Sequence, residues 1–388
     1  MTMQSQTGGY VYGQGVHGRV IDISSTDPED TDTFASFLEH EWNAKTPLLL
    51  YTLKGDGSGY DIVRLEGSPL LKALKKAVVD ASGKLVAKVF VGSDRSGSIT
   101  VEDAFVAELE VIRRLYNAFG KSKIKRMTAV QGLEVGKDKK KMVVHGLKIA
   151  GVFVVFNSKC EADLETHKMN SYSDVSVMID QILESLSHIH KEQVLHADIK
   201  LSNMMYCGSK SYKLIDWGAS ATFDEIRALY LATKMPRNIA SPMAWFAWGI
   251  TDDTILVNRK QIHKIIHAKM VRRQTLFIRP EFQEFVESSF ESYQKALEKL
   301  YKKHKGLDTR VRKAIIDTYM PSFDLYNFGL AVMAQALSPN LKLTEKQAAV
   351  LIEFATRLTH YDHAEFVGND AKVARRLWSV SKNNAPAP

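Results

Sequence analysis

The chain has 388 residues, of which 45% are hydrophobic and 25% charged, the proportions of a globular protein of two or three domains. Its net charge of +8 favours acidic partners or a solvated basic surface, and its two cysteines argue against a disulfide framework. The apolar runs are too short to span a bilayer, and the first residues lack the charged and apolar regions of a signal peptide. We therefore expect a soluble, intracellular, cytoplasmic protein.

A glycine-rich segment near the N-terminus has the pattern G-x-G-x-x-G-x-V, with the residues Gly13, Gly15, Gly18 and Val20. Glycines let a backbone close over phosphate groups without side-chain clashes, and the backbone amides can donate to phosphate oxygens. Dinucleotide-binding turns share the three glycines but continue into a helix. Here the β-forming residues Val20–Ile23 follow, so the sequence predicts a two-stranded hairpin over the phosphates of a nucleotide.

Residues 24–83 separate this hairpin from the next informative strand. We predict an insertion there, with a helix over Phe34–Trp42, a strand over Leu48–Leu53 and a lysine-containing helix over Leu70–Val79. A second glycine-rich turn, Gly55–Gly59, competes for the phosphate-binding role. Because this turn lacks the third-glycine spacing and the following valine, we predict an ordinary hairpin turn.

Two charged residues stand out in the elements after the insertion. The strand predicted over Leu85–Phe90 flanks Lys88 with apolar residues, so the Lys88 ammonium group is a candidate to bind nucleotide phosphates. The helix predicted over Val101–Leu115 places Glu108 on a partly buried face, with Glu110 as the alternative. Three further elements are predicted, namely strands over Met127–Val135 and Met142–Phe156 and an amphipathic helix over Met178–His190.

The most informative stretch follows this helix, where residues 196–203 have the pattern H-x-D-x-K-x-x-N and residues 216–218 are D-W-G. Phosphoryl transfer requires a carboxylate, here Asp198, that orients the attacking hydroxyl group and accepts its proton. Lys200 can reach the transferred group and offset its charge. The amide oxygen of Asn203 and the carboxylate of Asp216 can hold magnesium against the phosphates.

The C-terminal part contains a second predicted insertion at residues 250–317, which is rich in Lys and Arg and has helical spacing. This basic insertion is either a binding surface for an acidic or nucleic-acid partner or a solvated face. Asp324 follows in an apolar D-x-x-x-x-G helix, where an unpaired carboxylate would be costly. Closing helices are predicted over Leu341–Leu358 and Val373–Trp378.

Together these motifs resemble the protein kinase family, whose patterns are G-x-G-x-x-G-x-V, V-A-I-K, H-R-D-L-x-x-x-N and D-F-G. The resemblance implies an α+β, protein-kinase-like bilobal fold with a small β-rich N-lobe and a larger helical C-lobe. The N-lobe would occupy residues 1–156 with the insertion at 24–83. The C-lobe would occupy residues 157–380 with the insertion at 250–317, and residues 381–388 would form a flexible tail.

The resemblance also implies a Ser/Thr protein kinase that uses Mg²⁺ to transfer the γ-phosphoryl group of ATP to protein substrates. The implied catalytic residues are Asp198, Lys200, Lys88 and Glu108, of which Glu108 pairs with Lys88. The glycine-rich segment, Lys88, Asn203 and Asp216 would bind the nucleotide, and the last two would bind the metal. In this family, the aspartate at the position of Asp324 bonds to the backbone of the catalytic loop.

Two departures and two alternatives accompany the resemblance. Residues 238–243 have the pattern N-x-x-x-P without the acidic residue of the family's A-P-E motif, which is similar to kinases of large DNA viruses and implies a viral protein in the host cell or virion. Ala197 replaces the arginine that precedes the catalytic aspartate in much of the family. The alternatives are a small-molecule phosphotransferase of the aminoglycoside-kinase type, which Lys200 disfavours, and a pseudokinase that binds without catalysis.

Overall fold

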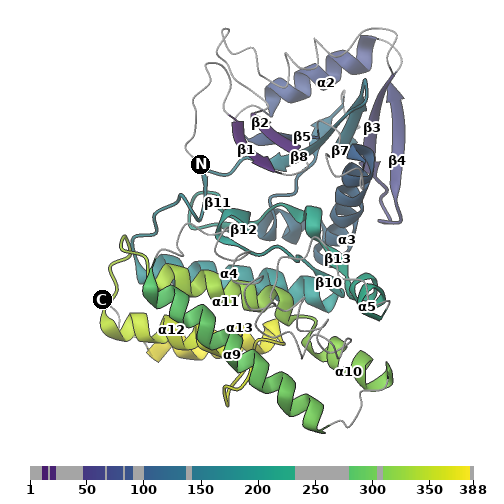
Figure 1. Cartoon of the computed structure of the whole chain (residues 1–388). Coiled ribbons are helices and arrows are strands. Elements are labelled where there is room, and N and C mark those ends of the chain that lie inside the picture. The colour runs from purple at the N-terminus through teal and green to yellow at the C-terminus, as the bar shows by residue number, and fades with distance from the viewer. Residues whose placement is uncertain are drawn as a thin grey trace. The chain divides into compact units, whose positions relative to one another are not determined.

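The computed structural model describes residues 11–15, 18–22, 47–65, 68–81, 84–90, 100–136, 142–231, 279–303 and 309–384, with backbone only over the first two ranges. The chain divides into two compact units, an N-terminal unit of residues 1–160 and a C-terminal unit of residues 161–388. The N-terminal unit contains a large sheet, and the C-terminal unit contains most of the helices (Figure 1).

The N-terminal unit is built on an antiparallel sheet with the strand order β1-β2-β5-β8-β7-β3-β4, and β6 pairs with β7. Its strands are β1 Val11–Gly15, β2 Gly18–Asp22, β3 Leu48–Leu53, β4 Tyr60–Leu65, β5 Leu85–Phe90, β6 Leu133–Val135, β7 Met142–Ile149 and β8 Val152–Ser158. The glycine-rich segment forms the β1–β2 hairpin, in which Gly15 pairs with Gly18. This confirms that a second strand, and not a helix, follows the glycines.

The first predicted insertion contributes to this sheet. Strand β3 pairs with β7, and β4 pairs with β3, so the hairpin β3–β4 extends one edge of the sheet. The two strands are joined by Lys54–Gly59, where the Lys54 amide donates to the Gly59 carbonyl at 2.9 Å. This confirms that the second glycine-rich stretch is an ordinary hairpin turn. The helix predicted over Phe34–Trp42 lies outside the described residues.

A helix packs on each face of the sheet, which explains why β5 is buried almost throughout and β8 over most of its length, whereas the edge strand β4 is mostly exposed or half-buried. Side chains alternate between the two faces of a strand. Leu48 and Leu50 of β3 join one buried cluster with Leu74 of α2 (Ser68–Asp80). Tyr51, which lies on the opposite face of the strand, instead packs edge-on against Phe105 of α3 (Val101–Met127).

Two predictions for the segment after Val101 are wrong in their boundaries. Helix α3 continues to Met127, with a break at Gly120, whose φ of 66° is outside helical values. The strand predicted over Met127–Val135 is reduced to β6, because Met127 is the last residue of α3 and residues 128–132 form no continuous strand pairing. The strand predicted over Met142–Phe156 is a hairpin of β7 and β8, because Ala150 and Gly151 have positive φ values and turn the chain.

The C-terminal unit is mainly helical in the described ranges. Its helices are α4 Tyr172–Lys191, α5 Phe223–Leu231, α9 Pro280–Lys303, α10 Thr309–Tyr319, α11 Ser322–Ala336, α12 Glu345–Thr359 and α13 Ala371–Ser381, followed by the 3-10 helix η4 Lys382–Asn384. Its short strands are β9 Ala162–Asp163, β10 Val194–Leu195, β11 Met204–Tyr206, β12 Tyr212–Leu214 and β13 Ala221–Thr222. The apolar residues predicted to give α4 one buried face are all buried, which confirms the helical period.

The described part of the second predicted insertion forms helices α9 and α10. The apolar positions Phe282, Phe285 and Phe290 of α9 are buried. The Ser289 hydroxyl lies 2.7 Å from the Tyr326 hydroxyl of α11. Helix α9 is therefore part of the core of this unit and not only a solvated basic face.

An antiparallel N-terminal sheet followed by a helical C-terminal region confirms the predicted α+β class. None of the helices in the described ranges combines the length and the apolar character that a bilayer crossing requires. Neither Cys160 nor Cys207 is a free thiol, which departs from the reduced cysteines that the cysteine count favours.

Candidate active site

The H-x-D-x-K-x-x-N motif lies in the loop between β10 and β11 and ends in the short 3-10 helix η1 (Leu201–Asn203). The Lys200 Nζ lies 2.6 Å from Oδ2 of Asp198. The Asn203 Nδ2 donates to the same carboxylate oxygen at 2.9 Å and to the Asp198 carbonyl at 2.8 Å. Three of the residues predicted for the site are therefore in direct contact. The Asp198 carboxylate binds the ammonium group of Lys200 and accepts from the amide group of Asn203.

The loop is held by Asp324, which lies in α11 and is completely buried. One carboxylate oxygen accepts from the His196 amide at 2.9 Å, and the other accepts from the Ala197 amide at 2.8 Å. This confirms that Asp324 bonds to the backbone of the loop that contains Asp198. Ala197 has a φ of 64°, a left-handed conformation that costs about 1–2 kcal/mol, and the bond to Asp324 helps to maintain it.

Asn203 and Asp216 lie at the same end of the β11–β12 hairpin. Met204 pairs with Leu214, and the Ile215 amide donates to the Asn203 carbonyl at 3.0 Å. Because the Asn203 amide nitrogen faces Asp198, its amide oxygen faces away from that carboxylate. An amide oxygen and a carboxylate at one hairpin end are the hard oxygen donors that Mg²⁺ prefers, so these residues fit the implied cation.

In the N-terminal unit, Lys88 of β5 forms an ion pair with Glu108 of α3, with Nζ and Oε2 2.6 Å apart. Their side chains are only 13% and 6% exposed, so the pair is well shielded from water. Glu110, the alternative partner, instead binds Arg113 and Arg114 of its own helix. Of the two glutamates that the sequence offers, the structure brings Glu108 to Lys88.

Other predicted site residues are described only in part. The backbone of Gly13, Gly15, Gly18 and Val20 lies in the β1–β2 hairpin, whose two turn residues lie outside the described residues. The N-x-x-x-P segment at residues 238–243 also lies outside them.

Two supporting contacts were not predicted from the sequence. His190, in the last turn of α4, places its Nε2 2.9 Å from Oδ2 of Asp324. The Trp217 ring of the D-W-G motif is buried, and its centroid lies 4.5 Å from that of His196. The sequence signal for His190 is weak, since a histidine near the end of an amphipathic helix has no particular spacing from Asp324.

Part of the chain matches a known protein family in sequence. The family model described as "Protein kinase domain" matches residues 78–303, more than half of the chain. This range includes Lys88, Glu108 and the catalytic loop but neither the glycine-rich segment nor Asp324.

Individual relatives match shorter segments. The dual specificity protein kinase zakA of Dictyostelium discoideum is 41% identical over 59 residues, 15% of this chain and 8% of the relative. The serine/threonine-protein kinase cds1 of Schizosaccharomyces pombe is 24% identical over 174 residues, 43% of this chain and 34% of the relative. Serine/threonine-protein kinase 1 of Heliothis zea nuclear polyhedrosis virus is 28% identical over 101 residues, which are 24% of this chain and 38% of the relative. The chain thus spans less than two fifths of each relative, and the family match over more than half of its own length shows that it belongs to the protein kinase family.

Proposed function

We propose that this chain is an active Ser/Thr protein kinase that transfers the γ-phosphoryl group of ATP to hydroxyl groups of protein substrates. The observation that carries the proposal is the contact of Asp198 with both Lys200 and Asn203, in a loop held by the buried Asp324. The similarity to two serine/threonine-protein kinases supports the choice of acceptor.

Each residue of the loop has a distinct task in this proposal. The substrate hydroxyl oxygen forms a bond to the γ-phosphorus as the bond from that phosphorus to the β,γ-bridging oxygen of ATP breaks, and ADP leaves. The carboxylate of Asp198 orients the hydroxyl and takes up its proton. Lys200, 2.6 Å from that carboxylate, offsets the negative charge on the transferred group.

Further residues are assigned to the nucleotide and to the cation in this proposal. Lys88 would bind the α- and β-phosphates while Glu108 fixes its position, and the glycine-rich hairpin would supply backbone amides. Asn203 and Asp216 would hold Mg²⁺ through oxygen atoms. A bound magnesium ion neutralises phosphate charge, which lowers the electrostatic cost of transfer.

The two alternatives have less support. A pseudokinase would lack a catalytic group, yet Lys88, Asp198, Asn203 and Asp216 are all present. A small-molecule phosphotransferase of the aminoglycoside-kinase type usually has another residue at the position of Lys200. A viral origin is weakly supported by the baculovirus relative, whose match covers 24% of the chain, and the partner of the basic insertion stays a prediction.

The test is transfer of labelled phosphate from ATP to a generic basic protein, followed by phosphoamino-acid analysis. We expect phosphoserine and phosphothreonine from the wild-type chain. Asp198→Asn should lower kcat by a factor of about 10²–10⁴, the usual contribution of a general base. The same variant should still show a thermal shift with magnesium-nucleotide. Wild-type turnover in Asp198→Asn would contradict the assigned role, and no transfer by the wild type would contradict the function.

A further inference from the structure

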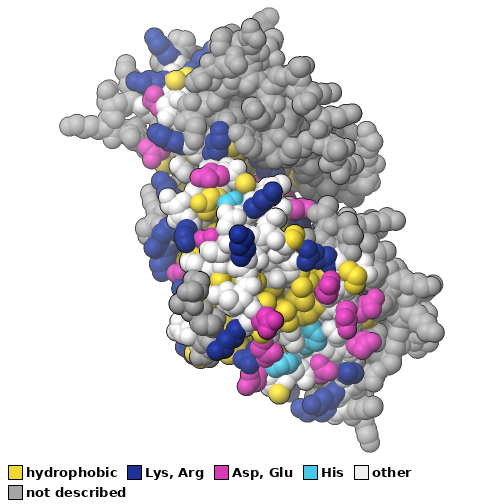
Figure 2. All heavy atoms as spheres, turned by 90° about the vertical axis from the view of Figure 1, so that its left-hand side faces the viewer, with side chains coloured by type: hydrophobic (Ala, Val, Ile, Leu, Met, Phe, Trp, Pro, Cys, Tyr) yellow, Lys and Arg dark blue, Asp and Glu magenta, His cyan; other side chains and the backbone are white. Residues whose placement is uncertain are grey.

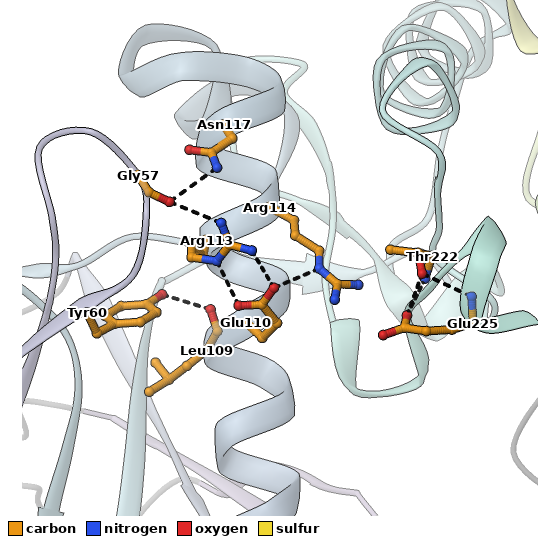
Figure 3. Close-up of polar contacts among 9 residues, drawn as sticks. All are labelled: Gly57, Tyr60, Leu109, Glu110, Arg113, Arg114, Asn117, Thr222 and Glu225. Atoms are coloured by element: carbon orange, nitrogen blue, oxygen red, sulfur yellow. Dashed lines mark hydrogen bonds and ion pairs between the residues drawn. The ribbon is translucent and has the colours of Figure 1, made fainter.

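The β3–β4 hairpin contacts helix α3 directly. The ring of Tyr51 on β3 packs edge-on against Phe105, with centroids 5.1 Å apart. At the start of β4, the Tyr60 hydroxyl donates to the Leu109 carbonyl at 2.8 Å (Figure 3). Burial raises the pKa of Tyr60 well above its ordinary value, so this hydroxyl keeps its proton and remains a donor at any physiological pH.

The turn of the hairpin contacts the next two turns of the same helix. The Gly57 carbonyl accepts from Arg113 Nη1 at 3.1 Å and from Asn117 Nδ2 at 3.3 Å (Figure 3). Arg113 is held in place by both carboxylate oxygens of Glu110, at 2.7 and 2.5 Å. Hydrogen bonding by Arg113 lowers the pKa of Glu110, so the carboxylate stays charged and the arginine stays oriented.

The turn is shaped for this contact. Gly57 has a φ of 71°, and a Cβ atom at this position would lie 2.0 Å from Oδ1 of Asn117. Any other residue would be strained at this φ value and would displace the Asn117 side chain, which donates to the turn. The contacted helix positions are 105, 109, 113 and 117, so they follow one another at intervals of about one helical turn.

These contacts bear on the ion pair in the same unit. Glu108 is adjacent in sequence to Leu109 and is 4% exposed, with Lys88 Nζ 2.6 Å from its carboxylate. In protein kinases this lysine–glutamate pair must be in place for transfer, and the position of the helix controls it. Contacts that fix α3 against the β3–β4 hairpin therefore also fix the position of Glu108 relative to Lys88.

We propose that the β3–β4 hairpin is a positioning element that holds α3 so that Glu108 stays paired with Lys88. Tyr60 and Arg113 are the positioning residues, and Gly57 lets the turn approach. The effect on turnover rests on the proposed kinase function. Since the hairpin belongs to the same chain, the helix is held without a partner protein or a phosphate group.

The first experiment measures the pair itself and does not require activity. The full chain is treated with limiting acetic anhydride, and acetylation of Lys88 is measured by mass spectrometry relative to exposed lysines of the same chain. We expect Glu108→Gln to raise Lys88 labelling by about fivefold or more. The double variant Tyr60→Phe with Arg113→Met, which keeps the ring and an aliphatic stem, should raise it to within twofold of that value.

Two further variants complete this experiment. Gly57→Ala acts from the hairpin side by displacing the Asn117 amide from the turn, and it should raise labelling by less than the double variant does. Ile62→Thr changes a β4 side chain that is 58% exposed and should leave labelling at the wild-type level. If the double variant and Gly57→Ala label Lys88 as the wild type does, while melting curves confirm that they are folded, the hairpin does not position the pair and the proposal is wrong.

The second experiment tests whether the hairpin acts through Glu108. We expect the double variant to lower kcat by tenfold or more with an unchanged KM for the protein substrate. In a Glu108→Gln background the same double variant should lower kcat by less than twofold, because residues acting through one contact are not additive. Equal losses in both backgrounds would indicate a general structural defect and would overturn the proposal. A wild-type chain without transferase activity would instead contradict the proposed function, and the labelling experiment would still decide the role of the hairpin.

Discussion

At the residue scale, the catalytic loop shows how one buried carboxylate can fix an otherwise unfavourable backbone. Ala197 is buried, and its φ of 64° is one that residues with a Cβ atom rarely adopt. Its amide and that of His196 both donate to Asp324, so each carboxylate oxygen has a backbone partner. The same bonds fix the start of the segment that contains Asp198, which connects a core aspartate to the chemistry.

We predict that Asp324→Asn weakens both folding and turnover. An amide side chain has one oxygen in place of two and would direct a donor at a backbone N–H group. Leaving one buried donor unsatisfied costs about 1–3 kcal/mol, measurable by denaturant unfolding, and kcat should fall at least tenfold. The matched control is Asp370→Asn, since Asp370 also accepts from two backbone amides but at the exposed start of α13. Equal effects in the two variants would contradict the role of Asp324.

We also predict that Asp216 determines the magnesium requirement of nucleotide binding. Asp216→Ala removes a hard oxygen donor beside Asn203, so the midpoint of a magnesium titration, followed by thermal shift at fixed ATP, should rise at least tenfold. Asp61→Ala removes an exposed carboxylate on β4 and should leave the midpoint unchanged. An unchanged midpoint in Asp216→Ala would exclude this carboxylate as a ligand.

At the scale of elements, helices α11 and α12 pack closely because the D-x-x-x-x-G motif ends in Gly329. A Cβ atom there would lie 2.6 Å from Cγ2 of Thr359 and 3.0 Å from Cβ of Leu358. The glycine thus sets the distance between the two helices, and Asp324 on the same helix reaches the catalytic loop from a rigid support. One motif therefore contributes both a packing contact and a positioning contact.

We predict that Gly329→Ala destabilises the protein by about 1–3 kcal/mol, the usual cost of overpacking a core. Thr359→Ser removes the methyl group that the new Cβ would meet but keeps the hydroxyl that bonds to the Ala355 carbonyl. Adding Thr359→Ser to Gly329→Ala should therefore recover part of the lost stability, as measured by urea unfolding of the three variants. If the loss in unfolding free energy in the double variant exceeds the sum of the losses in the two single variants, the contact with Thr359 is not the cause of the destabilisation.

The elements also show what the sequence could predict. The hairpin of the glycine-rich segment, the apolar face of α4 and the bond from Asp324 to the loop each follow from local periodicity or a short motif. The role of β3–β4 does not, because pairing with β7 joins residues almost a hundred positions apart and local patterns carry no information on partners. The strand predicted from Met127 is shorter than expected because, of residues 127–135, only Leu133–Val135 pair continuously with β7.

At the scale of the whole molecule, described side chains of both charges lie on the face drawn in Figure 2. Its described Lys and Arg side chains are interspersed with Asp and Glu side chains, as on a solvated surface. Among the described residues, several charged side chains form ion pairs, such as Lys382 with Asp180 and Arg375 with Glu184. A mixed surface of this kind supports solubility more than the binding of a polyanion.

Regulation belongs to the scale of the whole molecule, and we predict that the proposed kinase activity does not depend on phosphorylation after the D-W-G motif. A phosphate there activates by giving an arginine a charge to bind, but Ala197 offers no such group. Arg227 is already bound to Asp317, with Nη2 and Oδ1 2.6 Å apart, and also pairs with Asp224. The Thr222 hydroxyl donates to the Glu225 carboxylate at 2.8 Å (Figure 3), so a phosphate on Thr222 would meet a like charge.

The measurement is the initial rate before and after treatment of the purified protein with a phosphatase, with dephosphorylation verified by intact mass. The rate should stay within threefold of a mock-treated sample, because Ala197 in the catalytic loop cannot bind a phosphate and little free energy then couples that phosphate to the loop. Thr222→Ala should likewise keep the rate, with a small loss of stability from the removed contact to Glu225. A tenfold fall on dephosphorylation, which corresponds to about 1.4 kcal/mol of activation free energy, would show that another cation takes the place of the missing arginine.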